Sequence, residues 1–188
     1  RNYGSGNAGT TNVMRTLGKK AGIITYFVDA LKAVLAAVIV HFIFGKNSDY
    51  EMLLFLYSGL GVVLGHNFPF YLKFKGGKGI AASSGVVLSL LLFPKNCWVL
   101  SVLGLLTFAG VTYISKYVSL GSLVFIGLFF VEMVIYGICG WLPLTGSSLY
   151  EGLVITFIIT ALAFIRHHGN IQRLINGTER KIGQHKNN

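Results

Sequence analysis

The chain has 188 residues, of which 53% are hydrophobic and only 12% charged, and its mean hydropathy is +0.65. Ordinary soluble domains carry about 25% charged residues, so this composition excludes a soluble globular protein and predicts an integral membrane protein. The net charge of +10 arises from basic residues dispersed over several loops without a recognised nucleic-acid motif, which argues against a nucleic-acid partner. The length suits a single domain, 1–188, because each membrane span needs about 20 apolar residues.

The first polar segment, residues 4–15, reads GSGNAGTTNVMR. Its glycines match GxGxxG, but a dinucleotide fingerprint needs a preceding strand in a βαβ unit, which an apolar helical chain does not supply. Arg15 and Lys19 are four residues apart and would share one face of a helix, where both could reach one phosphate. An interfacial helix with solvated charges is an equally good interpretation. Because the chain begins at Arg1 inside this motif, we expect further N-terminal sequence to precede it.

Apolar runs between charged or turn-like residues predict an all-α polytopic bundle with six transmembrane helices. They lie at about residues 22–44, 52–70, 79–93, 97–114, 118–142 and 149–165. The third run is short and rich in Gly, Ala and Ser, which favours close helix contact or a half-embedded segment over a lipid-facing helix. Cys97 and Cys139 stand singly in apolar segments, so we expect packing residues and neither a disulfide framework nor a metal site.

Polar residues within the spans are few. Asp29 and Lys32 are three residues apart in the first span, and a structural pair on one helix face is a better interpretation than a proton relay. Glu132, in the fifth span, would be costly against lipid, so we expect it to face the bundle interior.

The basic residues are distributed unequally between the two faces that six spans would create. One face receives thirteen of them: Arg1, Arg15, Lys19, Lys20, Lys73, Lys75, Lys78, Lys116, Arg166, Arg173, Arg180, Lys181 and Lys186. The other face receives only Lys46 and Lys95. Basic residues in short loops mark the cytoplasmic side, so both ends of the chain and all its polar motifs are predicted there. Topology and attraction to anionic lipid headgroups explain most of the exposed lysines.

Residues 74–79 read FKGGKG and connect the second and third runs. Glycine permits positive φ and close approach to a ligand, and successive backbone N–H groups in such a loop can hold an anion. Lys78 adds a positive charge where the next segment begins, so a helix N-terminus can contribute as well. The loop is not a Walker A motif, because Gly79 and not Ser or Thr follows Lys78. We therefore predict a phosphate-binding loop, with a plain membrane-surface turn as the alternative.

Two further polar groups are predicted on the same face. Ser119 and Ser122 follow Lys116 and are candidate phosphate ligands, although serine at a helix start is more often an N-cap. His167 and Asn170 lie in RHHGN at the end of the last apolar run. A histidine there can simply cap the helix dipole, or it can accept a proton or hydrogen-bond an attacking hydroxyl near neutral pH.

Three segments, in this order, resemble the bacterial acyl-phosphate:glycerol-3-phosphate acyltransferases, the PlsY family: GSGNAGTTNVMRTLGKKAG, GHNFPFYLKFKGGKGIA and RHHGNIQRLINGTE. The resemblance covers almost the whole chain. It implies a seven-helix protein of the bacterial inner membrane, with one helix before GSGN and an active site that faces the cytoplasm. It also implies transfer of a fatty acyl group from acyl phosphate to the first hydroxyl of glycerol 3-phosphate, giving lysophosphatidic acid and inorganic phosphate at the first acylation step of phospholipid synthesis.

The resemblance carries over to individual residues and partners. It implies a catalytic group of Ser5, Arg15, His167 and Asn170, and a substrate phosphate-binding group of Asn12, Lys19, Gly76, Gly77, Lys78, Gly79, Ser119 and Ser122. The expected partners are glycerol 3-phosphate, a fatty acyl phosphate and membrane lipids, with no cofactor and no metal. The sequence departs from the family pattern at Gly169, where glutamate is common, and at Thr10, where alanine is common. The first departure leaves His167 without an assigned acidic partner.

The implied chemistry suits this composition. An acyl phosphate is already activated, so the enzyme mainly has to bind two anions and align a hydroxyl with the acyl carbonyl, while basic groups stabilise developing charge. Direct transfer is expected, with the proton going to His167 or to a phosphate oxygen. Acyl-CoA-dependent acyltransferases usually carry His, four residues and then Asp. Here the residues five after His41, His66, His167 and His168 are Lys46, Tyr71, Gln172 and Arg173, so that mechanism has no candidate site.

Two other classes compete with this interpretation. Glycine-rich helices that point their N-termini at an anion are also found in transporters, so a small multispan transporter for an anionic phosphorylated metabolite is the main alternative. Against it, the polar motifs gather at one face and not at the midplane. A structural or lipid-scaffolding protein would explain the topology and charge, but not the three polar motifs.

Overall fold

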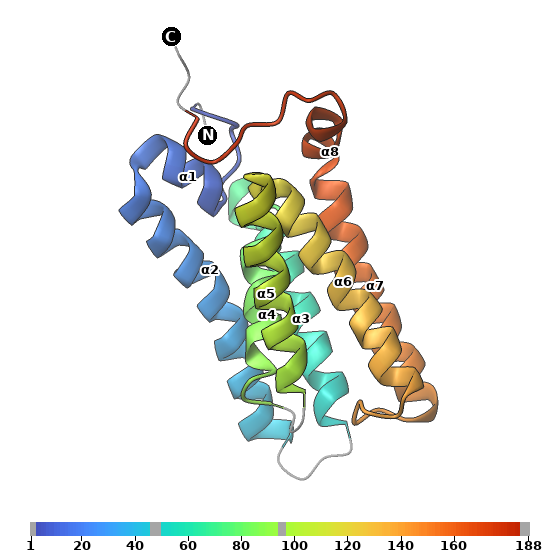
Figure 1. Cartoon of the computed structure of the whole chain (residues 1–188). Helices are drawn as coiled ribbons and strands as arrows, with labels where there is room; N and C mark the ends of the chain where they lie inside the picture. Colours follow the sequence, from blue (N-terminus) through green and yellow to red (C-terminus); the bar gives the residue numbers. More distant parts are fainter. Residues whose placement is uncertain (1–2, 46–49, 94–96, 185–188) are drawn as a thin grey trace.

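The computed structural model describes residues 3–45, 50–93 and 97–184. Its α-helices are α1 (Thr10–Leu17), α2 (Lys19–Val40), α3 (Glu51–Asn67), α4 (Ile80–Ser89), α5 (Trp98–Ser115), α6 (Val118–Ile138), α7 (Gly146–Arg166) and α8 (His168–Ile175). Short helical turns at His41–Gly45 and Phe70–Leu72 follow α2 and α3. Figure 1 shows the chain running back and forth between two ends, with α1 and α8 at the same end. We call this end the site end and the other the opposite end.

Five segments are long and apolar enough to cross a membrane: Lys19–Phe44, Glu51–Leu72, Trp98–Ser115, Val118–Ile138 and Gly146–Arg166. Large apolar side chains on their outer faces stay exposed, such as those of Phe27 and Val28 on α2. In water such a surface would be unfavourable, whereas a bilayer covers it. The described part of the chain is therefore a helical multi-pass membrane protein, as its composition predicts.

The prediction of six full spans is wrong for the third. Helix α4 has ten residues, and at 1.5 Å per residue it covers about half of a hydrocarbon core of about 30 Å. Its side chains are mostly buried inside the bundle. A β-carbon added to Gly85 would collide with the carbonyl oxygen of Ala30 on α2, so the predicted close contact is confirmed. In Figure 1 the chain still returns to the opposite end after α4, which preserves the alternation of the later helices.

The charge asymmetry follows this path. Figure 1 places the connections that carry the described basic residues at the site end, together with α1 and α8. Arg1, Lys46, Lys95 and Lys186 lie outside the described residues. The two ends of the described bundle therefore differ strongly in positive charge.

Predictions for the buried polar and sulfur-containing residues have mixed outcomes. Asp29 and Lys32 pair, with 2.8 Å between Oδ1 and Nζ, as their spacing predicts. Glu132 turns one carboxylate oxygen, Oε2, into the protein, where it has no hydrogen-bond partner among the described residues. Cys97 is buried as a packing residue, but Cys139 is exposed, so the packing prediction is wrong there.

The core lies between α3, α6 and α7, where Leu56, Ile126 and Phe129 are almost completely buried. Beyond α8 the chain folds back over the site end, and the N–H of Ile182 donates to the carbonyl oxygen of Lys116 at 2.8 Å. This return brings the C-terminal segment over the junction of α5 and α6.

Candidate active site

A cavity of about 150 Å³ lies at the site end, and all three polar motifs contribute to its wall. Of the residues predicted for a site, nine line it: Ser5, Asn12, Arg15, Lys78, Gly79, Ser119, Ser122, His167 and Asn170. Lys19, Gly76 and Gly77 do not line it. Segments more than 150 residues apart in the sequence thus meet around one space.

The glycines at 76 and 77 allow the loop to approach α3 closely. The N–H of Gly76 donates to the carbonyl oxygen of Asn67 at 3.0 Å, and the N–H of Gly77 donates to that of His66 at 3.1 Å. A β-carbon on Gly76 would collide with the carbonyl oxygen of His66, and one on Gly77 with the His66 ring. These two N–H groups are therefore already occupied, so the predicted anion-binding loop reduces to Lys78 and Gly79.

Arg166 holds the same loop from the α7 side. Its Nε donates to the carbonyl oxygen of Gly77 at 3.2 Å, and its Nη2 donates to those of Gly76 and Gly77 at 3.1 and 2.9 Å. Gly79 then takes a positive φ of 88° at the start of α4, a conformation that favours glycine. The loop is thus fixed between α3 and α7, with Lys78 at the cavity.

Lys78 leads into a chain of hydrogen bonds. Its ammonium group donates to Asn170 Oδ1, and Asn170 Nδ2 donates to Glu179 Oε1 at 2.8 Å. The hydroxyl of Ser119 donates to the same Glu179 oxygen at 3.0 Å, and Arg173 Nε donates to Oε2 at 2.7 Å. The FKGGKG loop, the start of α6 and the C-terminal motif are therefore joined through one carboxylate.

Glu179 and its partner Arg173 are site residues that the sequence analysis missed. Glu179 is 8% exposed, and it lines the cavity together with Arg173 and Arg180. One signal was available, because Glu179 is the only acidic residue that follows the last apolar run. Its carboxylate contacts Ser119, Asn170 and Arg173, whereas His167 Nδ1 contacts the carbonyl oxygen of Ala163.

The cavity carries excess positive charge. Burial, followed by the charge of Arg173, lowers the pKa of Lys78 to about 8. Burial lowers the pKa of Arg15 as well, and nearby Arg180 adds to that effect. Burial alone would raise the pKa of Glu179, but hydrogen bonds from its three donors outweigh it and hold that pKa below its ordinary value. Four cationic side chains (Arg15, Lys78, Arg173 and Arg180) and two carboxylates (Asp29 and Glu179) line this cavity, and the net positive charge suits an anion.

His167 ends α7 with its imidazole buried. Its Nδ1 lies 2.7 Å from the carbonyl oxygen of Ala163, so we assign the ring proton to Nδ1, which leaves Nε2 as an acceptor. Burial, followed by the charge of Lys78, lowers the pKa of His167 to about 4. The ring is therefore neutral at pH 7. It can accept a hydrogen bond from a hydroxyl, but it is a weak final acceptor for a proton.

The N-terminal loop is shaped by Asn12. Asn12 Oδ1 accepts the N–H of Ser5 at 2.7 Å, and its Nδ2 donates to the carbonyl oxygen of Tyr3 at 3.2 Å. The amide is thus engaged within the loop, although Asn12 lines the cavity. Thr10 Oγ1 also faces inward and has no partner among the described residues.

The remaining predicted residues are separate from this network. The Ser122 hydroxyl donates to the carbonyl oxygen of Val118 at 2.8 Å, while Lys19 is exposed at the start of α2. Within the ranges that the structure describes, no group of three His, Cys, Asp or Glu side chains could hold a metal ion.

Comparison with known proteins places this cavity in context. A family model described as glycerol-3-phosphate acyltransferase matches residues 1–177. The glycerol-3-phosphate acyltransferase of Clostridioides difficile (strain 630) is 42% identical over 186 residues, which cover 99% of this chain and 83% of the relative. That of Thermoanaerobacter sp. (strain X514) is 41% identical over 187 residues, which cover 98% and 82%.

Solved structures agree with these matches. The crystal structure of PlsY (YgiH), an integral membrane glycerol 3-phosphate acyltransferase in its glycerol 3-phosphate form, superposes with a TM-score of 0.79 at 34% identity. The match covers 97% of this chain and 82% of that one. The lysophosphatidic acid form gives a TM-score of 0.76 at 34% identity, covering 95% and 81%.

Proposed function

This chain belongs to the glycerol-3-phosphate acyltransferase family, and on that premise we propose that it transfers a fatty acyl group from an acyl phosphate to the sn-1 hydroxyl of glycerol 3-phosphate. The products are lysophosphatidic acid and inorganic phosphate. The observation that supports this most is a cationic cavity, built by three distant motifs, that adjoins an apolar cavity within the bundle.

The cationic cavity suits phosphate groups. Lys78 and Arg15 approach it from two segments, and Glu179 neutralises only part of the surrounding charge. Gly79 and Ile80 also line it, so the N-terminus of α4 contributes its dipole. Because donor and acceptor both carry phosphate, a site with several cations can hold the two anions whose mutual repulsion would otherwise oppose the reaction.

The apolar cavity provides a path for the acyl chain. Tyr26, Ile80 and Phe108 line both cavities, so the two are adjacent. Gly104 and Leu105 of α5 also line the apolar cavity, and Leu105 is 59% exposed. An acyl chain placed there would have its phosphorylated end in the cationic cavity and its tail toward lipid.

In the proposed reaction the sn-1 oxygen of glycerol 3-phosphate forms a bond to the acyl carbon, and the bond from that carbon to the phosphate oxygen breaks. Nε2 of His167 accepts a hydrogen bond from the attacking hydroxyl and orients it. With a pKa of about 4, His167 is less basic than a phosphate whose second pKa is about 6. The hydroxyl proton therefore passes to a phosphate oxygen, and no covalent enzyme intermediate forms.

The topology supports a location in the bacterial inner membrane with the site facing the cytoplasm. The described basic residues of the connections gather at the site end, and such residues mark the cytoplasmic side. This orientation lets a soluble substrate meet a lipid-bound one at the membrane surface.

The test uses the protein purified in detergent with palmitoyl phosphate and glycerol 3-phosphate, following phosphate release and acylglycerol phosphate formation together. We expect equimolar products that disappear when glycerol 3-phosphate is omitted. Phosphate release without an acylated product would indicate hydrolysis only. In proteoliposomes, uptake of glycerol 3-phosphate with no acyl product would instead support a transporter.

His167 gives the proposed mechanism its own test. Glutamine at position 167 can still accept a hydrogen bond but cannot act as a base near neutral pH. We expect His167→Gln to retain substantial turnover and His167→Ala to lose it, measured as kcat at saturating substrate. Equal and severe loss in both variants would show that His167 is an essential base.

A further inference from the structure

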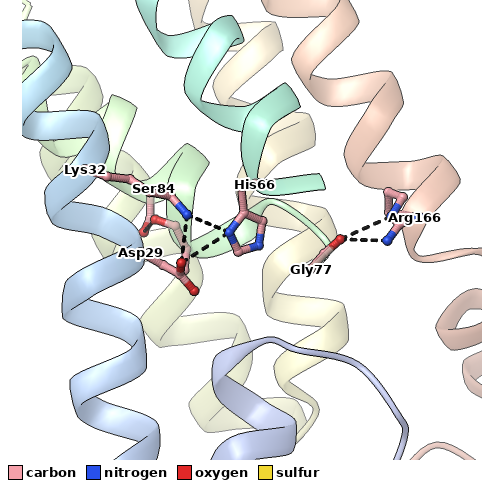
Figure 2. A network of polar contacts seen from close by, with 7 residues as sticks. Asp29, Lys32, His66, Gly77, Ser84 and Arg166 are labelled. Atoms are coloured by element: carbon pink, nitrogen blue, oxygen red, sulfur yellow. Dashed lines mark hydrogen bonds and ion pairs between the residues drawn. The ribbon is translucent and has the colours of Figure 1, made fainter. Parts of the chain in front are cut away.

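Three polar side chains from α2 and α3 meet beside the cationic cavity and take no part in the reaction above. Lys32 Nζ lies 2.8 Å from Asp29 Oδ1 and 2.8 Å from His66 Nδ1, while His66 Nδ1 lies 3.2 Å from Asp29 Oδ1. We call Asp29, Lys32 and His66 the α2–α3 latch (Figure 2). Both helices belong to membrane-spanning segments, where ionisable residues are costly without partners and often mark functional sites.

The latch has a definite hydrogen-bond arrangement. Nδ1 of His66 can make only one bond at a time, and the shorter contact is the one to the Lys32 ammonium group. We assign Nδ1 as the acceptor of a Lys32 proton, which leaves the ring proton on Nε2. Lys32 then donates both to His66 and to Asp29, and joins the two helices.

The latch continues directly into the FKGGKG loop. The imidazole of His66 lies against Gly77, since a β-carbon there would collide with Nε2, and the carbonyl oxygen of His66 accepts the Gly77 N–H at 3.1 Å. In Figure 2 the His66 ring stands between the Asp29–Lys32 pair and the Gly77 carbonyl that Arg166 holds. The residue that follows Gly77 is Lys78.

We propose that Asp29, Lys32 and His66 are positioning residues. They hold the FKGGKG loop in the position from which Lys78 contacts Asn170 in the cavity. This inference rests on the proposed function, because the anion that Lys78 would bind is the phosphate of a substrate. Asp29 and His66 line the cationic cavity as well as a second cavity bounded by Gly76 and Gly77, so the latch forms the wall between them. The three residues act through the loop and not on the reacting atoms.

The chain offers matched controls at the far ends of the same two helices. His41 Nδ1 lies 2.5 Å from Glu51 Oε1, a histidine–acid contact between the end of α2 and the start of α3. Asp29→Asn removes the charge that pairs with Lys32, and His66→Gln removes the ring that lies against Gly77. Glu51→Gln and His41→Gln make the equivalent changes in this second link. A general loosening of α2 from α3 would affect both pairs alike.

The measurement is the separation of kcat from KM for glycerol 3-phosphate. We expect Asp29→Asn and His66→Gln to raise KM between about tenfold and about 100-fold, with a smaller change in kcat, because a displaced Lys78 weakens anion binding. The two control variants should keep the wild-type KM. For Asp29→Asn the direction of the change in KM distinguishes the two explanations. Neutralising an acid near an anion site would lower KM by electrostatics alone, whereas a displaced Lys78 raises it.

A double-mutant cycle tests the link between latch and loop. Gly77→Ala should impair binding because the new methyl group meets the His66 ring. If the loop is positioned through that ring, combining Gly77→Ala with His66→Ala should cost less than the sum of the two single effects. Additive effects would overturn the link.

Two results separate this proposal from the proposed function. Calorimetric titration of glycerol 3-phosphate reports binding even if no acyl transfer is found, so a wild type that binds without transferring would contradict only the reaction. The latch proposal is overturned if the wild type transfers the acyl group but the latch variants have the same KM and Kd as His41→Gln and Glu51→Gln. If His66→Gln does not fold, Asp29→Asn carries the same comparison.

Discussion

The two ends of the α2–α3 pair carry nearly the same chemistry in different surroundings. At the site end, His66 meets Asp29 and Lys32 beside a cationic cavity. At the opposite end, His41 meets Glu51, and its ring stacks on Phe93 with the centroids 3.7 Å apart. A histidine–acid contact between transmembrane helices therefore does not by itself indicate function. We infer a functional role only for the contact that lies beside the cationic cavity and Lys78. The following variants test whether the site end differs from the opposite end in this way.

The largest loss of activity is expected in the hydrogen-bond network of Lys78, Asn170 and Glu179, a feature of the site end alone among the contacts compared above. Asn170 is buried and joins Lys78 to Glu179, so Asn170→Ala leaves both charged groups without that partner. We expect kcat/KM to fall by about 100-fold. Asn176→Ala, at the exposed end of α8, is the control and should keep wild-type activity. Wild-type activity in Asn170→Ala would show that Lys78 needs no such support.

Glu179→Gln should combine a loss of activity with a loss of stability. Its carboxylate accepts hydrogen bonds from Ser119, Asn170 and Arg173, and bonds to a charged acceptor contribute about 1.5–3 kcal/mol each. Because the folded-state pKa of Glu179 is depressed, its stabilising effect is present above its ordinary pKa and is lost as the pH falls through the folded-state value. The unfolding temperature (Tm) of the variant should therefore be lower than that of the wild type at pH 7, and it should fall less as the pH is lowered. An unchanged acid dependence would contradict this account.

The affinity for glycerol 3-phosphate should depend on the charge of Lys78. With a pKa of about 8, Lys78 loses its proton as the pH rises through 8, while the substrate phosphate, with a second pKa of about 6, stays doubly charged. We expect KM at pH 9 to be about tenfold above its low-pH limit. Lys78→Arg should remove this rise, because arginine stays protonated. If KM of the wild type stays constant up to pH 9, the charge of Lys78 does not control the affinity for glycerol 3-phosphate.

A smaller effect is expected in the apolar cavity. A β-carbon on Gly104 would lie 2.9 Å from Phe125 and 3.2 Å from Val87, whereas one on Gly110 meets nothing within 4 Å. Gly104→Ala should lower kcat/KM for long-chain acyl phosphates relative to short ones by less than about tenfold. Gly110→Ala, on the same helix, should leave the chain-length profile unchanged. Identical chain-length profiles in both variants would show that the acyl chain does not bind in this cavity.

Much of this arrangement was predictable from the sequence, because apolar length and basic loops follow directly from the physics of a bilayer. The failures have physical causes. Residues 79–93 are apolar enough to suggest a span, but the buried interior of the bundle attracts the same composition as lipid does. Gly76 and Gly77 were predicted to bind phosphate because glycine permits close approach; in the structure they lie close to α3, and their contact with a ligand stays a prediction. Glu179 was missed because only the fold-back of the C-terminal segment brings it to the cavity.

The measurement that tests the central claim most directly is calorimetric titration of glycerol 3-phosphate against the wild type, Lys78→Met and Lys73→Met. Both variants remove one lysine from the same loop, but only Lys78 lines the cationic cavity. We expect Lys73→Met to bind like the wild type and Lys78→Met to lose about 100-fold in affinity, which corresponds to about 2.7 kcal/mol. Wild-type binding by Lys78→Met, or an equal loss in both variants, would contradict this expectation.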